Sequence, residues 1–326
     1  MRKELMFLTQ LSIFLVLSCG QKDPLGVPLG FLFVDSDPDS ALIFLEGKST
    51  GLVTPDTLTE VTTGAHTVSV LLVGYESDPA ERIIQVKLGE VASAYFTLTL
   101  ASAARIVLLE EFTNTSCIPC AQASPILDAI AAYRGRDEVV AVKYHAWFPG
   151  PTDPFYLADT QDNQARVGYY SVTGIPHLRI DGTTVSPSLD STRIESDIDA
   201  RLGYPSPIEL SADYEVSGSQ YSVTARVIGL EDPGYEDLMI RFALVESGIH
   251  IEPPPGANGE TDFEHTLRKM LPDATGEHFH VQPGDTLEFR RQLTLDPDWN
   301  VDRLETVVFV QSESGLEVIG ACSDHQ

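Results

Sequence analysis

The sequence predicts a multidomain protein that combines α/β and all-β parts: an α/β domain lies between a small N-terminal β-sandwich and a C-terminal β-sandwich. The length of 326 residues suits two or three domains. The middle of the chain carries strand and helix patterns in turn, whereas both flanks carry short alternating strands. The 24 glycines and 21 prolines, spread along the chain, supply the many turns that a β-rich fold needs.

Composition and charge exclude several classes of protein. The chain is 43% hydrophobic and 21% charged, which is ordinary for a globular protein and excludes a wholly disordered, collagenous or multi-span membrane protein. Lys and Arg number 21 against 48 Asp and Glu, so the net charge is -27. Because such a polyanion repels phosphate backbones, we expect no nucleic-acid partner.

Residues 1–18 are typical of an export signal. Arg2 and Lys3 provide a positive start, and residues 5–17 form a short apolar core. A bilayer-spanning helix needs roughly 20 apolar residues, so this core is too short to remain as a membrane span. We therefore expect a signal peptide over residues 1–18.

The signal ends at a lipidation motif. Val16-Leu17-Ser18-Cys19 resembles the bacterial lipobox, in which the cysteine receives lipid and becomes the new N-terminus. The resemblance implies a lipid anchor at Cys19, through which the protein is attached to the membrane, and a tether over residues 19–29. Gly20 resembles the residue found in lipoproteins that are sent to the outer membrane. The alternative is a plain secretory signal with an incidental cysteine.

Residues 30–100 form the predicted N-terminal β domain. Turn residues separate its short apolar runs at intervals that suit hairpins. The runs are 31–34, 41–45, 66–73, 83–88 and 94–100. Pro38-Asp39-Ser40-Ala41, followed by spaced glycines and Gly74-Tyr75, resembles the PEGA domain of bacterial surface proteins. The resemblance implies a spacer or binding module without catalytic chemistry.

Residues 105–203 change period and form the predicted α/β domain. Residues 105–112 form a largely apolar strand, of the kind that is buried on both faces of a sheet. A helix over 121–133 and a strand over 138–144 complete a β-α-β unit. The remaining expected elements are a hairpin of 177–180 and 183–185 around Asp181-Gly182 and an amphipathic helix over 189–202.

Residues 206–322 return to alternating apolar and polar positions. About six strands over this length predict an immunoglobulin-like β-sandwich. Pro253-Pro254-Pro255-Gly256 opens a long loop that this fold must accommodate.

The candidate site is Cys117-Ile118-Pro119-Cys120, between the strand that ends at Phe112 and the helix that follows. The N–H groups and dipole at a helix N-terminus stabilise a thiolate. Cys117 can therefore attack a substrate disulfide, after which Cys120 resolves the mixed disulfide. Pro119 shapes the first turn, where its missing N–H costs nothing. A zinc site would need a second cysteine pair, which the chain lacks, so we predict no metal. The alternative is a permanently oxidised structural disulfide.

This region resembles the thioredoxin family. Glu111-Phe112, Cys117-Ile118-Pro119-Cys120, Pro125-Ile126-Leu127-Asp128 and Gly174-Ile175-Pro176 occur in thioredoxin order. The resemblance implies that Pro176 follows a cis bond and packs against the disulfide, while Ile175 offers its backbone to an extended substrate. Ile118 and Pro119 complete the implied substrate surface.

The same resemblance implies that Glu111 lies under the disulfide near Cys120. Neighbouring Glu110 points to the opposite face of the strand, so the two acids occupy different environments. Burial without a cation raises a carboxyl pKa above its usual value of about 4.3. Glu111 is thus the expected base for Cys120 during resolution. The alternative is a Glu111 that faces solvent at a sheet edge.

The insertion after the second strand and two C-terminal sequences also resemble a family of exported lipoproteins. Residues 147–168 form an insertion flanked by Tyr144-His145 and Tyr169-Tyr170, and it contains Asp153-Pro154-Phe155. This insertion, together with the sequences at 268–271 and 307–311, is similar to thioredoxin-like lipoproteins related to the 28-kilodalton outer membrane protein of anaerobic bacteria. The resemblance implies a lipid-anchored protein of the bacterial cell envelope, at the outer membrane, facing the periplasm or the surface.

The favoured function is a membrane-anchored extracytoplasmic thiol–disulfide oxidoreductase that acts on the thiols and disulfides of exported proteins, without a cofactor. The dipeptide Ile118-Pro119 lacks the histidine of strongly oxidising relatives, which favours reduction or isomerisation. The first alternative is a surface binding or adhesion lipoprotein whose thioredoxin-like scaffold is redox-inactive. The second is a copper-handling protein that uses both cysteines and His145.

Two other features have plain interpretations. Cys322, near the end of the chain, is expected to be a free or disordered thiol, with pairing to another chain as the alternative. His278 and His280 share one face of a predicted strand, as metal ligands can, but surface histidines are commoner at such positions.

Overall fold

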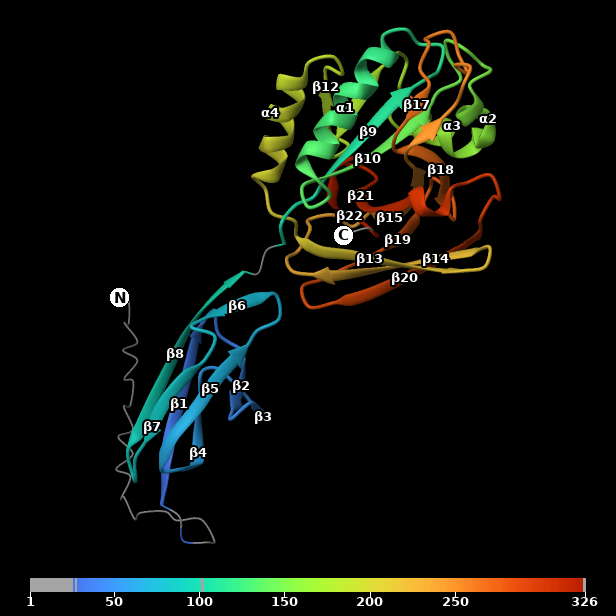
Figure 1. Cartoon of the computed structure of the whole chain (residues 1–326). Coiled ribbons are helices and arrows are strands. Elements are labelled where there is room, and N and C mark those ends of the chain that lie inside the picture. The colour runs from blue at the N-terminus through green and yellow to red at the C-terminus, as the bar shows by residue number, and fades with distance from the viewer. Residues whose placement is uncertain (1–25, 27, 101–102, 325–326) are drawn as a thin grey trace, which may run out of the picture. The chain divides into compact units, whose positions relative to one another are not determined.

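The computed structural model describes residues 26, 28–100 and 103–324 (Figure 1). The predicted signal peptide, Cys19 and most of the tether lie outside the described residues. The chain divides into two compact units, with the division between Thr99 and Leu100. The described part of the chain contains no helix that is long and apolar enough to cross a membrane.

The first unit consists of two four-stranded sheets around one apolar core. The sheet orders are β4-β1-β8-β6 and β3-β2-β5-β7. The strands are β1 (Leu29–Asp37), β2 (Leu42–Leu45), β3 (Lys48–Val53), β4 (Asp56–Thr62), β5 (Gly64–Leu71), β6 (Tyr75–Asp78), β7 (Arg82–Val86) and β8 (Val91–Leu100). The expected N-terminal β-sheets are confirmed, but the sequence patterns miss β3, β4 and β6. These strands are short and carry many exposed polar side chains, so they lack the apolar run that marks a strand.

The second unit begins with an α/β arrangement. Its elements are β9 (Val107–Thr113), α1 (Cys120–Arg134), β10 (Val139–His145), α2 (Pro154–Ala158), α3 (Thr160–Tyr169), β11 (His177–Ile180), β12 (Thr184–Ser186) and α4 (Ser191–Leu202). Strands β9 and β10 are parallel, and β11 joins β9 in the antiparallel direction. The β-α-β unit, the 177–185 hairpin and the last helix therefore form where the sequence predicts them.

Helices cover both faces of this part of the sheet. Side chains of α1 and α4 pack with Leu109 on one face, and Val167 and Tyr170 of the α3 region pack with Phe112 on the other. The complete burial of β9 follows from this double cover. The inserted residues supply α2 and α3, whose short helical patterns the sequence analysis did not separate from a loop.

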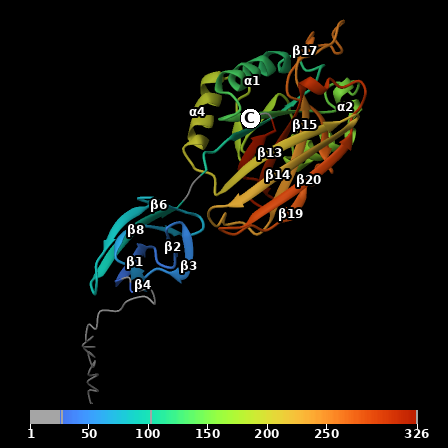
Figure 2. The ribbon, with the colours of Figure 1, turned by 60° about the horizontal axis from the view of Figure 1, so that its bottom comes forward.

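The remaining elements are mostly strands. They are β13 (Ile208–Ser217), β14 (Gln220–Gly229), β15 (Leu238–Glu246), β16 (Ile249–His250), β17 (Asp262–Phe263), β18 (Thr266–Leu271), β19 (Glu277–Phe279), β20 (Thr286–Thr294), the 3-10 helix η1 (Val301–Arg303), β21 (Leu304–Ser312) and β22 (Val318–Ser323). Strands β13, β14 and β20 form a separate three-stranded layer (Figure 2). This layer shares an apolar core with β15, β21 and β22.

One continuous sheet crosses the expected boundary between residues 203 and 206. Its order is β12-β11-β9-β10-β18-β15-β21-β22, with β19 added to β15. The join is made where β10 pairs with β18 in parallel, and the N–H of Lys143 donates to the carbonyl of His265 at 2.8 Å. The α/β part and the C-terminal strands therefore belong to one compact unit. The sequence predicts a strand over residues 138–144, but it does not show that a C-terminal strand lies beside it.

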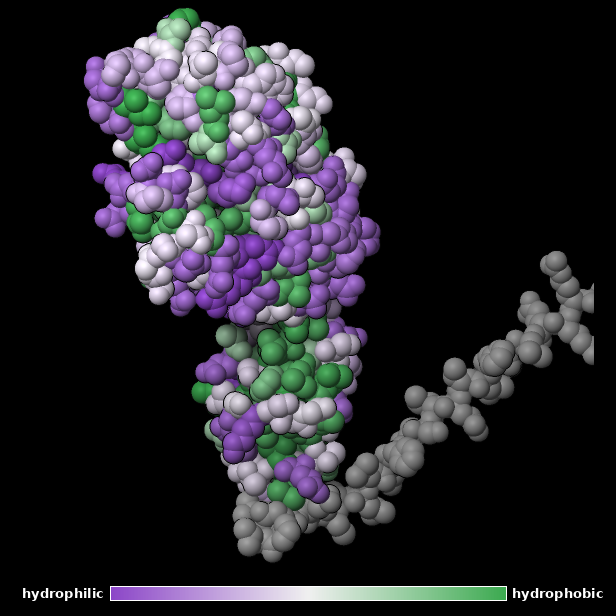
Figure 3. All heavy atoms as spheres, turned by 90° about the vertical axis from the view of Figure 1, so that its right-hand side faces the viewer, coloured by the Kyte–Doolittle hydropathy of each residue, from purple (hydrophilic) through white to green (hydrophobic). Residues whose placement is uncertain are grey.

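Much of the face of the second unit shown in Figure 3 is hydrophilic. This agrees with the large excess of acidic residues in the sequence.

Candidate active site

The two cysteines of the Cys-Ile-Pro-Cys motif form a disulfide at the start of α1. Cys120 is the first residue of the helix and is fully buried, whereas Cys117 keeps 4% of its surface exposed. The N–H of Cys120 lies 3.2 Å from Sγ of Cys117 and points at it. This donor would stabilise a thiolate on the outer sulfur once the disulfide is reduced.

The Gly174-Ile175-Pro176 loop lies beside the outer sulfur. The peptide bond before Pro176 is cis, and Sγ of Cys117 is 3.8 Å from the carbonyl oxygen of Ile175. Ile118, between the two cysteines, has 58% of its surface exposed. The structure thus brings together the residues that the thioredoxin resemblance implies for substrate binding.

Glu111 is buried on β9, on the α1 side of the sheet. The alternative of a solvent-facing Glu111 at a sheet edge is wrong, because β9 lies between β10 and β11. Burial raises the pKa of Glu111 to about 7, and Lys143 opposes this increase. The expected direction of the shift is confirmed. The expected absence of a cation is wrong, since Nζ of Lys143 is 3.7 Å from Oε2 of Glu111.

Lys143 is the main site residue that the sequence analysis missed. It is the register partner of Glu111 on the neighbouring strand, and its Nζ lies 2.6 Å from Oδ1 of Asp128 on α1. Burial lowers the pKa of Lys143, but the carboxylates of Glu111 and Asp128 raise it above its usual value. The sequence did contain a signal for this residue, because Lys143 is the single charged residue in the apolar run of residues 139–144.

His145 and Asp153 form a second buried pair beside the disulfide loop. Nδ1 of His145 is 2.8 Å from Oδ2 of Asp153, and the same oxygen accepts the N–H of Thr115 at 2.7 Å. Asp153 also accepts the N–H groups of Phe155 and Tyr156 at the start of α2. His145 and these donors lower the pKa of Asp153 although burial alone would raise it. The pair therefore fixes the insertion against the loop that precedes Cys117.

The loop that begins at Pro253-Pro254-Pro255-Gly256 also reaches this site. The N–H of Asn258 donates to the carbonyl of Thr115 at 3.0 Å, and its Nδ2 lies 3.4 Å from the carbonyls of Asn114 and Cys117. A side chain at Gly256 would stand 2.1 Å from the carbonyl oxygen of Thr115, so only glycine allows this approach. The sequence places this loop in the C-terminal part of the chain and gives no sign of the contact.

Cys322 and the histidine pair are separate from the site. Cys322 is a free thiol, but it is fully buried in β22, so the expectation of disorder is wrong and pairing with another chain has no exposed sulfur to use. Burial raises the pKa of its thiol. The rings of His278 and His280 lie 4.7 Å apart. Within the described residues, no group of three or more potential ligands could hold a metal ion.

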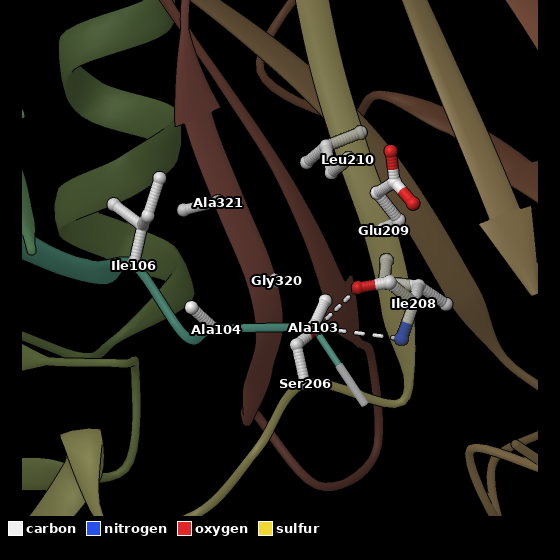
Figure 4. A pocket seen from close by; sticks show the side chains of 9 residues that line it. All are labelled: Ala103, Ala104, Ile106, Ser206, Ile208, Glu209, Leu210, Gly320 and Ala321. Carbon is white, nitrogen blue, oxygen red and sulfur yellow. Dashed lines mark hydrogen bonds between the residues drawn. The ribbon is translucent and has the colours of Figure 1, made fainter. Parts of the chain in front are cut away.

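A pocket of about 270 Å³ lies elsewhere in the second unit (Figure 4). It is lined by Ala103, Ala104, Ile106, Ser206, Ile208, Glu209, Leu210, Gly320 and Ala321. Glu209 is the sole ionisable side chain in this lining, and Ser206 Oγ donates to the carbonyl of Ile208 at 2.6 Å. The pocket thus has no cluster of reactive groups.

Comparisons with known families agree with this architecture. Residues 163–323 match the family described as outer membrane protein Omp28, and residues 29–102 match the PEGA domain. The chain carries an Omp28 family domain behind an N-terminal PEGA domain. The Omp28 match begins within α3 and runs to the last strand, so it too crosses the expected boundary at 203–206. The family places the protein among outer membrane lipoproteins, as the sequence predicts.

One solved structure has a similar fold over about two thirds of this chain, and two others give lower TM-scores. HBP35 of Porphyromonas gingivalis has a TM-score of 0.57 and 16% identity, over 68% of this chain and 76% of that chain. A protein from Agrobacterium tumefaciens gives 0.48 and 18%, over 68% and 95%. A domain of the outer membrane lipoprotein Omp28 from P. gingivalis gives 0.28 and 19%, over 36% and 86%. The comparison with curated proteins gives no match.

Proposed function

We propose that this protein is a thiol–disulfide oxidoreductase, held at the outer membrane by lipid on Cys19, that acts on the thiols and disulfides of exported proteins. The observation that carries the proposal is the position of the Cys117–Cys120 disulfide, with its outer sulfur beside the carbonyl of Ile175 and its inner sulfur buried in α1. A purely structural disulfide would not need a buried acid or a substrate-facing loop beside it.

The proposed fold of residues 105–203 is thioredoxin-like. Parallel β9 and β10 with α1 between them, followed by the β11–β12 hairpin and α4, support this assignment. We assign the strands after residue 206 to an immunoglobulin-like sandwich. One of its sheets is β13-β14-β20, and the other is the C-terminal part of the continuous sheet that also contains β9 and β10, so the sandwich is not a separate body.

In the proposed reaction the reduced protein donates two electrons to a substrate disulfide. The Cys117 thiolate attacks one substrate sulfur, which forms a mixed disulfide and releases the other substrate sulfur as a thiolate. Cys120 then passes its proton to Glu111 and attacks Sγ of Cys117. This step releases the second substrate sulfur as a thiolate and leaves the Cys117–Cys120 disulfide. A dithiol reductant restores the reduced protein, and the same steps in reverse would oxidise a substrate.

We assign the substrate surface to apolar groups of the disulfide loop and of the loop that holds Ile175. Ile118 lies between the two cysteines and has 58% of its surface exposed, and the half-buried Ile175 has its carbonyl oxygen 3.8 Å from Sγ of Cys117. An extended polypeptide could contact these side chains and hydrogen-bond the backbone of Ile175 while its cysteine meets Cys117. These features support a protein substrate rather than a small thiol.

Trapping of mixed disulfides tests this function. In Cys120→Ser the mixed disulfide cannot be resolved, so we expect this variant to accumulate covalent complexes with exported proteins. Cys117→Ser should accumulate few, because Cys120 is buried. Equal trapping by both variants, or none by either, would contradict the proposal. A wild-type protein that exchanges no disulfides would instead favour the binding lipoprotein with an inactive scaffold.

Incorporation of fatty acid tests the proposed anchor. Labelled fatty acid should enter the wild-type protein and not Cys19→Ala, because the cysteine thiol is the site of lipid attachment. Equal labelling of the two proteins would show that the anchor is not at Cys19.

A further inference from the structure

The proposed reaction requires a route for a proton out of a buried site. Cys120 and Glu111 are 0% and 1% exposed, and Lys143 is 3% exposed. Among the described residues, Oε2 of Glu111 has no hydrogen-bond partner. Glu111 can accept the proton of Cys120 in a resolution step only after its own proton has left, so the transfer of that proton to solvent limits the rate of resolution. None of these three residues has the exposure to deliver it to water directly.

Residues 256–260, hereafter the 256–260 segment, lie against the disulfide loop. Gly256 and Asn258 contact Thr115, and Nδ2 of Asn258 is within 3.4 Å of the carbonyl of Cys117. The same Nδ2 donates to Oε2 of Glu260 at 3.2 Å, while the N–H of Glu260 donates to Oδ1 of Asn258 at 3.0 Å. The Glu260 carboxylate is therefore held one amide group away from the backbone of the attacking cysteine.

Glu260 combines partial exposure with an electrostatic interaction with the buried charges. Its side chain is half-buried, unlike Glu111. The ionisable groups whose charges act on it are Lys143 and His145 on β10, Asp128 on α1 and Glu111 on β9. Burial raises the pKa of Glu260 and Lys143 opposes this, so Glu260 responds to the same lysine as Glu111.

We propose that Glu260, supplied by the C-terminal half of the molecule, is the outer proton-transfer group of the redox site and connects the Glu111–Lys143 pair to solvent. This inference rests on the proposed oxidoreductase function. Cys120 gives its proton to Glu111, Glu111 gives it to the Glu260 carboxylate by way of water, and Glu260 releases it to the solvent. Lys143 stays protonated throughout, and no electrons move in these steps.

The proposed role of Glu260 also assigns a function to the contact between the 256–260 segment and the disulfide loop. The segment comes from the loop between β16 and β17, far in sequence from the cysteines. Its backbone contacts with Thr115 would hold the loop in place without any acid. The Glu260 carboxylate adds a second partly exposed acid near the disulfide loop, besides Asp128 of α1, which contacts Nζ of Lys143 at 2.6 Å.

The test uses the full-length protein and separates attack from resolution by stopped-flow measurement. Glu260→Gln keeps the shape and the contact with Asn258 but cannot carry a proton. We expect its resolution step to slow about 10-fold, with the rate of attack by Cys117 unchanged. Glu252→Gln is the matched control, because Glu252 is exposed on the same loop, and it should behave as wild type.

Rescue by a small acid distinguishes proton transfer from a structural role. In Glu260→Ala, added acetate should restore the resolution rate in proportion to its concentration, because acetate can carry the proton through the space that the side chain leaves. Wild-type resolution in Glu260→Gln, or a slow rate that acetate does not change, would overturn the proposal. A wild-type protein without disulfide exchange would overturn the proposed function as well, so the two failures are distinguishable.

Discussion

Two neighbouring glutamates on β9 show how one strand serves two different purposes. Glu110 and Glu111 are both buried and point to opposite faces of the sheet. Both carboxylate oxygens of Glu110 are hydrogen-bonded, to Arg166 at 2.5 Å and to the hydroxyl of Tyr170 at 2.5 Å. Among the described residues, the cation paired with Glu111 is Lys143, whose Nζ lies 3.7 Å from Oε2 of Glu111. The same residue type is satisfied on one face and left partly unsatisfied on the other.

The Glu110 face joins parts of the chain that are distant in sequence. Arg166 of α3 also contacts Oε1 of Gln311 on β21 at 3.3 Å, and Nε2 of Gln311 donates to Tyr170 at 2.7 Å. The guanidinium of Arg166 lies 4.6 Å from the ring centre of Tyr169. A buried charge with this many partners stabilises the joint between the α/β part and the C-terminal strands. The partly unsatisfied acid on the other face is the one that can exchange a proton.

The largest expected effect is the loss of stability in Glu110→Ala. Removing this carboxylate leaves the buried Arg166 without its counter-charge, which costs about 3–5 kcal/mol of unfolding free energy. Glu111→Ala should cost less, because its carboxylate is already disfavoured by burial. Urea denaturation of both variants at neutral pH measures the difference. A larger loss in Glu111→Ala than in Glu110→Ala would reverse the comparison.

The second prediction concerns pH. Glu111 has a pKa of about 7 in the folded protein against its usual value of 4.5. Below pH 4.5 it is protonated in both the folded and the unfolded state, so its ionisation costs no unfolding free energy there. The cost appears as pH rises through this interval and reaches about 3 kcal/mol above pH 7. The unfolding free energy of the wild type should therefore fall by this amount relative to Glu111→Gln.

Urea denaturation of the oxidised wild type and Glu111→Gln, from about pH 4 to about pH 8, tests this dependence. The comparison uses one substitution at one site, so other titrating groups cancel in the difference. A difference in unfolding free energy that stays constant over this range would show that Glu111 ionises normally in the folded protein.

Much of the site follows from local sequence. The apolar run before Phe112, the cysteine pair at a helix start and the Ile175–Pro176 dipeptide each signal their position without knowledge of the tertiary fold. The alternation of side chains along a strand also separates Glu110 from Glu111. These features depend on neighbours in the chain, which is why the sequence predicts them.

The parts that the sequence misses depend on strand pairing across the chain. Lys143 becomes the partner of Glu111 through the register of β10 on β9. The contact of Asn258 with Thr115, like the pairing of β10 with β18, joins the α/β part to residues that come much later in the chain. A lysine in an apolar strand and an asparagine in a proline-rich loop have many possible neighbours, and the pattern of residues does not choose among them.

The third prediction is kinetic. Glu111→Gln preserves the shape of the side chain and removes the base, so resolution of the mixed disulfide should slow by about 10²-fold. Attack by Cys117 should change much less, because its thiolate is stabilised by the helix N-terminus and the N–H of Cys120. Glu209→Gln, at an exposed acid on β13, is the control. Equal stopped-flow rates in wild type and Glu111→Gln across neutral pH would remove Glu111 from the mechanism.

The smallest expected effect comes from Lys143→Met, which keeps a long side chain in place of the cation. Lys143 lowers the pKa of Glu111 against the effect of burial, so its removal should raise that pKa further above 7, by about one unit. The pH at which resolution reaches half its maximal rate should move upward by the same amount. Lys143→Arg retains the charge and should keep the midpoint near that of the wild type. If the midpoint in Lys143→Met matches that in Lys143→Arg, the lysine neutralises Asp128 alone, and the two faces of β9 differ by burial rather than by their cations.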